Sequence, residues 1–286
     1  MRVRPITVTL GAEIENVDLI DGLDQTLADD LYELLLDRGV LVFRNQPLTP
    51  EAHIAFAASF GPVGAPHPLY PQVPGHHQIN VIRNDAENPP ENESWHTDLS
   101  CKPQPPYASV LRGRLIPPVG GDTLWCDLRA VHDALPAATR KVFEALSAEH
   151  RLDHAFQFLE EFGQTGRQDA LGKTKSADFN TIHPAIVTHP GSQRRVLYVN
   201  ENFTTRLIGV SQSESETLLR RAFDAVKNPR FQMRMRWQPD TVLIWDNWAT
   251  QHFASGDHYP MHQREVQRVT VSSNGRTGPL MTSSPT

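Results

Sequence analysis

The chain has 286 residues, of which 39% are hydrophobic and 21% are charged, and its net charge is −6. This composition is typical of a globular protein with a sizeable core, and the interspersed charges exclude the basic stripe that nucleic-acid binding needs. No apolar run reaches the roughly eighteen residues that would predict a membrane span.

The first sixty residues predict two helices and a short strand. Residues 25–38 place leucines on one helical face, and Gly39 ends the pattern. Residues 40–43 then predict a buried strand, and Thr49-Pro50-Glu51 predicts a helix start with Thr49 as its cap. Because residues 1–5 lack an apolar signal region, we expect a cytoplasmic protein in which Cys101 and Cys126 are buried thiols rather than a disulfide.

The stretch Trp95-His96-Thr97-Asp98 is the first motif that suggests chemistry. In an extended segment alternate side chains share a face, so His96 and Asp98 are expected to point the same way. Short His-X-Asp strings also arise by chance, above all in a chain with 13 histidines. The motif therefore depends on a third ligand elsewhere in the chain.

The second half of the chain predicts further strands with helices packed outside them. Ser211 and Glu214 form a capping box that opens a helix ending before Pro229. Residues 231–237, 242–245 and 264–271 are expected to be strands, which together favour an antiparallel barrel or jelly roll. Residues 160–180 are a candidate active-site lid, and we expect one domain over residues 1–272 with a disordered tail over 273–286.

His252 supplies the missing third ligand. Two imidazoles and one carboxylate, here His96, Asp98 and His252, form the ligand set of non-haem iron(II) oxygenases, which leaves positions for a cosubstrate and O2. The usual cosubstrate, 2-oxoglutarate, needs a cation for its distal carboxylate. Arg264 and Arg268 follow on the last predicted strand and share one of its faces. If that face points inward, one arginine would bind 2-oxoglutarate and the other an acidic substrate; the alternative is an exposed strand face.

Several motifs occur in an order that resembles the taurine dioxygenase family. They cover residues from about Ile6 to about Val271 and are Trp95-His96-Thr97-Asp98, Gly120-Gly121-Asp122-Thr123-Leu124-Trp125, Tyr198-Val199-Asn200, Phe203-Thr204-Thr205-Arg206, Trp245-Asp246-Asn247 and Gln251-His252. The resemblance implies a mainly β, double-stranded β-helix (a cupin-like jelly roll) with flanking helices. It also implies an enzyme that depends on Fe(II), 2-oxoglutarate and O2.

The resemblance assigns roles to individual positions. His96, Asp98 and His252 match the iron ligands, and Thr123 and Arg264 match the 2-oxoglutarate contacts. The positions that match substrate contacts are His67, Tyr70, Asn92, Leu99, Phe156, Phe203 and Arg268. Two departures concern the substrate: Ala155 stands where taurine dioxygenases have a small hydroxyl residue, and one extra residue separates His252 from Arg264.

The expected reaction is hydroxylation of the carbon that bears a sulfonate, taurine above all. The products would be aminoacetaldehyde, sulfite, succinate and CO2. The alternatives are a sister oxygenase for an alkyl sulfate, a phenoxyalkanoate or another small organic acid, the phenoxyalkanoate being suggested by Cys126-Asp127-Leu128-Arg129. Asp98 argues against a halogenase, and a non-catalytic binding protein would leave Thr123 and both arginines unexplained. A zinc hydrolase is disfavoured because no further carboxylate falls naturally into the role of general base. A small anionic partner is expected, without nucleic acid or membrane, and a homo-oligomer is compatible with the sequence.

Overall fold

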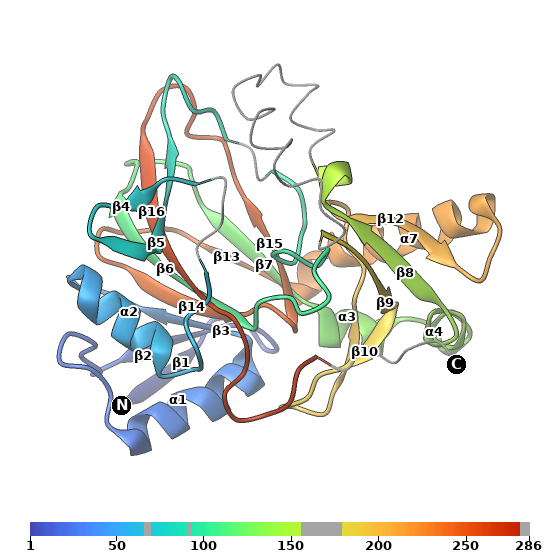
Figure 1. Ribbon diagram of the computed structural model, residues 1–286, viewed down its shortest axis with the longest axis horizontal. Helices are drawn as coiled ribbons and strands as arrows, with labels where there is room; N and C mark the ends of the chain where they lie inside the picture. Colours follow the sequence, from blue (N-terminus) through green and yellow to red (C-terminus); the bar gives the residue numbers. More distant parts are fainter. Residues whose placement is uncertain (66–69, 91–92, 156–178, 281–286) are drawn as a thin grey trace.

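The computed structural model describes residues 1–65, 70–90, 93–155 and 179–280. Its largest sheet has eight strands, and most neighbouring strands in it are distant in sequence (Figure 1). In spatial order they are β1 (Arg2–Pro5), β2 (Ala12–Glu15), β3 (Val40–Phe43), β14 (Val242–Asp246), β6 (Ala108–Leu115), β16 (Arg264–Val271), β5 (His76–Asn84) and β4 (Gln72–Val73).

Three smaller sheets complete the β structure. They are β13 (Gln232–Met235), β7 (Thr123–Asp127) and β15 (Thr250–Ala254); β12 (Thr204–Ile208), β8 (Ser147–Arg151) and β9 (Asn180–Pro184); and the pair β10 (Ile186–Thr188) with β11 (Arg195–Leu197). The β13-β7-β15 sheet packs on the large sheet through a shared apolar cluster that includes Trp125 and Trp245. These two facing sheets form the jelly roll that the sequence predicts.

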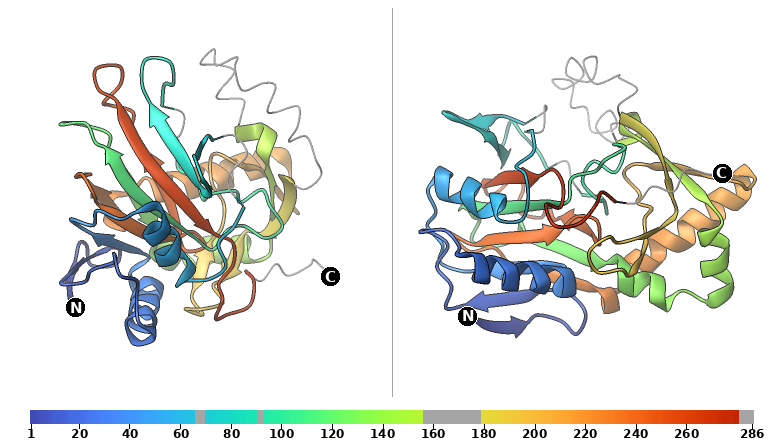
Figure 2. Two further views of the ribbon diagram at one scale, coloured as in Figure 1. Left: turned by 60° about the vertical axis from the view of Figure 1, so that its left-hand side comes forward. Right: turned by 60° about the horizontal axis from the view of Figure 1, so that its bottom comes forward.

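The helices lie outside the sheets, as two further views confirm (Figure 2). α1 and α2 lie on the side of the N-terminal strands, whereas α3, α4 and α7 lie beside the smaller sheets (Figure 1). Their bounds are α1 (Gln25–Arg38), α2 (Pro50–Ala58), α3 (Leu128–Ala134), α4 (Ala137–Glu144), α7 (Gln212–Val226) and the 3-10 helix η3 (Pro229–Phe231).

The predicted helix ends are confirmed. Gly39 adopts a left-handed conformation at φ 68°, and its N–H donates to the Leu35 carbonyl, so it ends α1. The Thr49 side chain caps α2 by accepting from the Ala52 N–H, and Ser211 with Glu214 forms the predicted capping box of α7. In each case a local polar side chain or a glycine satisfies the backbone groups that a helix end leaves unpaired.

The predicted strands are also confirmed, with one shorter than expected. β3 and β16 match residues 40–43 and 264–271, β14 extends the predicted 242–245 by one residue, and β13 covers only residues 232–235 of the predicted 231–237. On β16 the buried residues alternate, so that Arg264, Val266 and Arg268 face inward together. The alternative of two exposed arginines is wrong.

The structure differs from the expectations for residues 95–98 and for the residues that follow 272. Residues 95–98 do not form a strand: only His96 makes a β-bridge, and residues 98–100 turn. The chain also keeps contact with the body beyond residue 272, because Asn274 Nδ2 donates to Tyr32 Oη at 2.8 Å and Leu280 is buried. The domain boundary itself stays a prediction, and nearly all of the candidate lid 160–180 lies outside the described residues.

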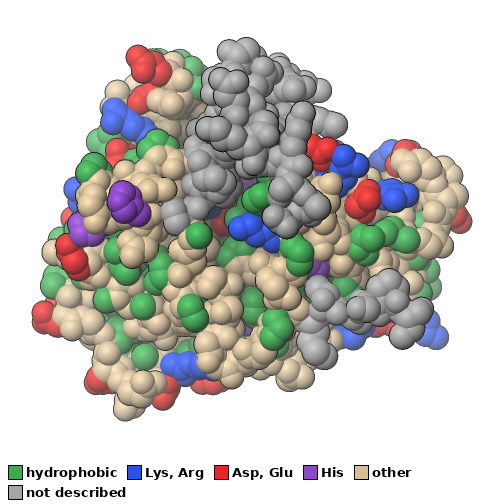
Figure 3. All heavy atoms as spheres, in the orientation of Figure 1, with side chains coloured by type: hydrophobic (Ala, Val, Ile, Leu, Met, Phe, Trp, Pro, Cys, Tyr) green, Lys and Arg blue, Asp and Glu red, His purple; other side chains and the backbone are tan. Residues whose placement is uncertain are grey.

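Surface and core agree with the composition. Basic and acidic side chains are interspersed on the face that Figure 3 shows. Within the described ranges no helix is long and apolar enough to span a bilayer. Cys101 and Cys126 are buried free thiols, as predicted.

Candidate metal centre and anion pockets

A short β-bridge brings the two predicted histidine ligands together. The His96 N–H donates to the His252 carbonyl at 3.1 Å, and the His252 N–H donates back to the His96 carbonyl at 2.9 Å. His252 lies on β15, where it pairs with Trp125 of β7, so the sheet fixes its position. The two imidazole centroids are therefore only 4.1 Å apart.

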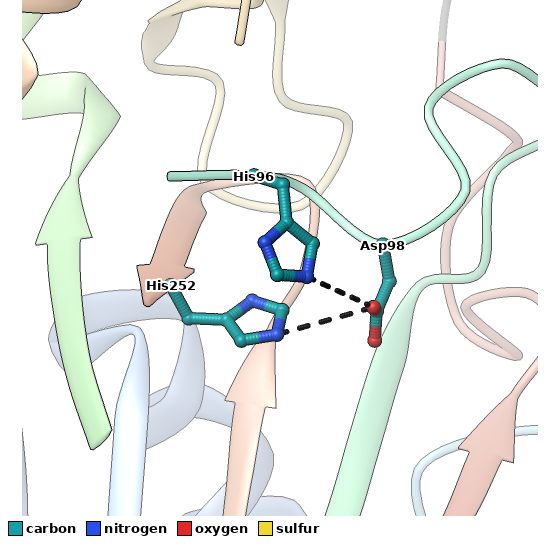
Figure 4. A group of neighbouring side chains, drawn as sticks. All are labelled: His96, Asp98 and His252. Atoms are coloured by element: carbon teal, nitrogen blue, oxygen red, sulfur yellow. Dashed lines mark ion pairs between the residues drawn. The ribbon is translucent and has the colours of Figure 1, made fainter. Parts of the chain in front are cut away.

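Asp98 lies at the start of a turn and places its carboxylate beside the two imidazoles. Its carboxylate Oδ1 lies 3.7 Å from His96 Nε2 and 3.9 Å from His252 Nε2 (Figure 4). Asn247 holds the turn from both sides: its Oδ1 accepts from the Asp98 N–H at 2.8 Å, and its Nδ2 donates to the Asp98 carbonyl at 3.0 Å. The convergence predicted from strand alternation is thus real, but an asparagine clamp produces it.

The protonation states suit a metal ion. Burial lowers the pKa of His252 to about 3, and burial also lowers the pKa of His96. Both rings are therefore neutral at physiological pH, as a ligand imidazole must be. His96 Nδ1 donates to the Ser94 carbonyl at 2.8 Å, which leaves Nε2 without a proton and directed at the centre.

The donor set fits a non-haem iron site. The potential ligand atoms of His96, Asp98 and His252 all lie within 4.8 Å of one another, and all three residues are buried. Two neutral imidazoles and one carboxylate would hold an iron(II) ion and leave positions for further ligands. The three residues border a cavity that Arg264, Arg268 and Thr123 also line.

Arg264 provides a buried positive charge in that cavity. It is 4% exposed, and no carboxylate of the described residues forms an ion pair with it. Its Nε donates to the Gly121 carbonyl at 3.0 Å, and its Nη2 lies 3.4 Å from Thr123 Oγ1. Burial lowers its pKa to about 10, so the guanidinium remains charged at neutral pH. A charge held this way calls for an anionic ligand such as a carboxylate.

Gly121 allows the Arg264 side chain to lie where it does. The glycine has φ +69°, and a Cβ there would lie 2.9 Å from Arg264 Cδ and 3.0 Å from Pro117 Cγ. Thr123, two residues on, is oriented by Trp237, whose Nε1 donates to Thr123 Oγ1 at 3.0 Å. The Gly-Gly-Asp-Thr motif therefore has a packing role in addition to its turn.

If Arg264 binds 2-oxoglutarate, as the sequence predicts, Gly121→Ala is expected to raise the KM for this cosubstrate by about 10- to 100-fold, because the added methyl displaces Arg264. Gly75→Ala is the matched control: Gly75 has φ +81°, but a Cβ added there would meet no atom within 4 Å. Both variants carry similar backbone strain, so the fall in melting temperature of Gly75→Ala measures that strain without the displacement of Arg264. An unchanged KM in Gly121→Ala would contradict this role.

Arg268 shares the inward face of β16 with Arg264 and contacts the candidate ligand Asp98. Its Nη1 lies 3.1 Å from Asp98 Oδ2, and its guanidinium carbon is 5.4 Å from the centroid of the Tyr70 ring. Ser109 Oγ donates to the same carboxylate oxygen at 3.2 Å. Arg268 is 7% exposed, and its Nε has no partner among the described residues. The side chain lines both cavities of the site, so it places a positive charge at their border.

Two cavities meet at Asp98 and Arg268. The first contains the metal centre, Phe203 and Leu99, and the second is lined by Leu99, Lys102, Gln104 and Thr270. Leu99, Asp98 and Arg268 border both. Together the two cavities are lined by apolar side chains such as Leu99 and Phe203 and by the cations Arg264, Arg268 and Lys102.

The predicted site residues are only partly placed by the structure. His67, Asn92 and Phe156 lie outside the described residues, whereas nine others surround the two cavities: Tyr70, His96, Asp98, Leu99, Thr123, Phe203, His252, Arg264 and Arg268. Sequence reasoning missed Asn247, Ser109, Trp237 and Lys102. The Trp245-Asp246-Asn247 motif was a signal for Asn247, whereas nothing local marks the other three.

The comparisons with known proteins agree with this geometry. A family model described as "Taurine catabolism dioxygenase TauD, TfdA family" matches residues 2–270. An alkylsulfatase from Acinetobacter baylyi is 33% identical, over 97% of this chain and 87% of its own length. A 2,4-dichlorophenoxyacetate dioxygenase from Cupriavidus pinatubonensis is 30% identical, over 93% and 96%.

A solved structure gives the same result for the fold. A taurine dioxygenase from Burkholderia xenovorans superposes with a TM-score of 0.81 at 33% identity, covering 99% of this chain and 95% of the other. The three relatives are thus similar to this chain over nearly its whole length, whereas their named substrates differ.

Proposed function

The chain belongs to the taurine catabolism dioxygenase TauD, TfdA family, and we propose that it oxidises the carbon next to the head group of a small organosulfur anion. The enzyme is an Fe(II)- and 2-oxoglutarate-dependent dioxygenase. Bound iron and 2-oxoglutarate would supply the oxidising power, by coupling O2 reduction to decarboxylation of the cosubstrate to succinate and CO2.

The chain's own residues divide the remaining tasks. His96, Asp98 and His252 would hold the iron, and Arg264 with Thr123 would bind the distal carboxylate of 2-oxoglutarate. Trp125, Trp245 and Phe203 line the cavity and are buried, so they would exclude water from the reacting groups. No side chain needs to act as an acid or a base on the substrate.

The proposal of an anionic head group rests on the position of Arg268. It is a buried cation that borders both cavities beside the candidate metal ligands. A sulfonate or sulfate there would place the adjacent C–H bond toward the iron without ligating it. Hydroxylation of that carbon gives an unstable product. A hydroxylated sulfonate separates into an aldehyde and sulfite, and a hydroxylated sulfate ester separates into an aldehyde and sulfate.

Taurine is the candidate that the sequence motifs indicate. A second candidate, an alkyl sulfate with an uncharged tail, is favoured by the pocket wall. Among the described residues that line the two cavities, Asp98 is the sole carboxylate, and Lys102 adds a cation to the second cavity. Among these described residues an ammonium group would find no anion besides Asp98, whereas an alkyl tail would contact Leu99 and Phe203. The alkylsulfatase relative is consistent with this candidate.

A product assay decides between these substrates. The Fe(II)-loaded protein is incubated with 2-oxoglutarate, O2 and either taurine, hexyl sulfate or 2,4-dichlorophenoxyacetate, and succinate, sulfite and sulfate are measured. Sulfite or sulfate released in step with succinate supports the proposal. Succinate formation stimulated only by the phenoxyacetate, or by none of the three, would refute the organosulfur assignment.

Arg268→Ala is expected to raise the KM for the organosulfur substrate by about 10- to 100-fold, because a charged hydrogen-bond donor to the head group is lost. Arg268→Lys keeps the charge but loses the second donor arm, so an intermediate KM is expected. The KM for 2-oxoglutarate should change far less than that for the substrate. Equal rises in both KM values would show that Arg268 acts mainly through Asp98, to which it is bonded.

A further inference from the structure

Asp98 is followed by a turn that an ordinary chain would not adopt unaided. Leu99 has φ +51°, a left-handed conformation that costs energy for any residue with a branched side chain. The conformation places Leu99 at the border of both cavities and Asp98 at the metal centre. Contacts further along the chain must therefore hold the turn, and the next residue, Ser100, makes them.

Ser100 is fully buried and lies at the centre of a polar network. Its Oγ accepts from Asn200 Nδ2 at 2.9 Å and lies 3.0 Å from His150 Nδ1. Because the serine oxygen accepts from the amide, its own proton can be donated to His150 Nδ1. Burial keeps the pKa of His150 well below its usual value, so the ring is neutral and Nδ1 can accept.

A second histidine holds the backbone of the same turn. His183 Nε2 lies 2.9 Å from the Ser100 carbonyl and 3.1 Å from the Lys102 carbonyl, so its N–H donates to these oxygens. His150 belongs to β8 and His183 to the adjacent β9, with their ring centroids 5.3 Å apart. Side chains from β8 and β9 thus hold the residues that follow Asp98.

The same network extends to the substrate wall. Asn200 Oδ1 accepts from the Phe203 N–H at 2.9 Å, which also fixes the orientation of the Asn200 amide. Phe203 packs with Leu152 and Cys101, and Leu99 packs against this cluster. The metal-ligand turn and the aromatic wall are therefore parts of one hydrogen-bonded unit.

From this geometry we propose that Ser100 and Asn200 are positioning residues, which set the place of the Asp98 carboxylate by holding the strained Leu99 turn. Asn247 clamps the Asp98 peptide, and Ser100 with Asn200 fixes the chain on the C-terminal side of Leu99. The proposal concerns the metal site alone, so it stands or fails independently of which organosulfur compound is the substrate.

Titration of the metal-free protein with Co(II), followed by its visible absorption, tests the proposal. Ser100→Ala is expected to weaken Co(II) binding by about tenfold, as loss of a residue that orients a ligand does. The matched control is Thr205→Val. Thr205 lies on β12, and its hydroxyl donates to Glu149 of β8 rather than to the network around Ser100. The control should keep the Co(II) affinity of the unmodified protein.

A double-mutant cycle of Ser100 and Asn200 shows whether the two residues act on Co(II) binding through their common hydrogen bond or through a general loss of structure. Asn200→Ala is expected to weaken Co(II) binding as much as Ser100→Ala, and the double variant little more than either, because each change breaks the same bond. Ser100→Cys, which keeps a weak donor in place, should bind Co(II) with intermediate affinity and provides the test if Ser100→Ala does not fold. Unchanged Co(II) affinity in a folded Ser100 variant, or an equal loss in Thr205→Val, would overturn the proposal.

Discussion

Replacing Asp98 by alanine is expected to abolish succinate formation and the binding of divalent metal. The carboxylate is the only anionic ligand of the centre among the described residues, and without it two neutral imidazoles remain. The change also leaves Arg268 buried without its partner, and breaking a buried ion pair typically costs about 3–5 kcal/mol of stability. The melting temperature of the metal-free variant should therefore fall as well.

Asp98→Asn separates the two effects, because an amide can still accept from Ser109 but carries no charge. We expect it to melt closer to the unmodified protein and still to lack turnover. Asp133→Ala removes a surface carboxylate bonded to Arg194 and serves as the control, with activity retained. Full turnover in Asp98→Ala would show that the metal is held elsewhere.

Replacing Arg264 by methionine is expected to weaken 2-oxoglutarate binding strongly. Unlike Asp98→Ala, it should not lower the stability of the ligand-free protein. The KM for 2-oxoglutarate should rise by at least about 100-fold, because a buried, bidentate carboxylate partner is lost. The ligand-free protein should be no less stable, since burial of this guanidinium lowers its pKa to about 10 and no described carboxylate forms an ion pair that offsets that cost.

The expected change in stability follows from the direction of the pKa shift. A cation whose pKa is lowered by folding destabilises the folded state at every pH at which it remains charged, which includes neutral pH. Removing it relieves that cost, while the lost hydrogen bonds to Gly121 and Thr123 offset part of the gain. Thermal unfolding without and with 2-oxoglutarate measures both effects. A variant that unfolds much more easily yet binds 2-oxoglutarate normally would contradict the assignment.

The sequence predicts most of this fold because its signals are local. Capping by Thr49 and Ser211 and termination at Gly39 depend on neighbouring residues, so the helix ends are correct. Alternation along residues 264–271 likewise gives the inward face of β16. The structure brings the predicted metal ligands and Arg264 to one cavity, and the sequence could single them out because iron and 2-oxoglutarate demand these residue types.

The remaining features depend on contacts between distant segments. Asn247 holds Asp98 across 149 residues, and Asn200 bonds to Ser100 across 100 residues, so no local pattern reveals either contact. For the same reason the sequence predicts an extended segment at Asp98. In the structure residues 98–100 form a turn instead, in which Leu99 has a left-handed backbone conformation. The substrate-binding roles of all seven positions stay predictions, and three of them, His67, Asn92 and Phe156, lie outside the described ranges.

The most direct test of the central claim is an anaerobic absorption titration. Fe(II) and then 2-oxoglutarate are added to the metal-free protein, and the visible charge-transfer band of the iron–2-oxoglutarate complex is recorded before and after hexyl sulfate or taurine. We expect a band in the unmodified protein, no band in Asp98→Ala, a much weaker one in Arg264→Met, and a shift of the band on adding the substrate. An unmodified protein that binds Fe(II) but develops no band with 2-oxoglutarate would contradict the account.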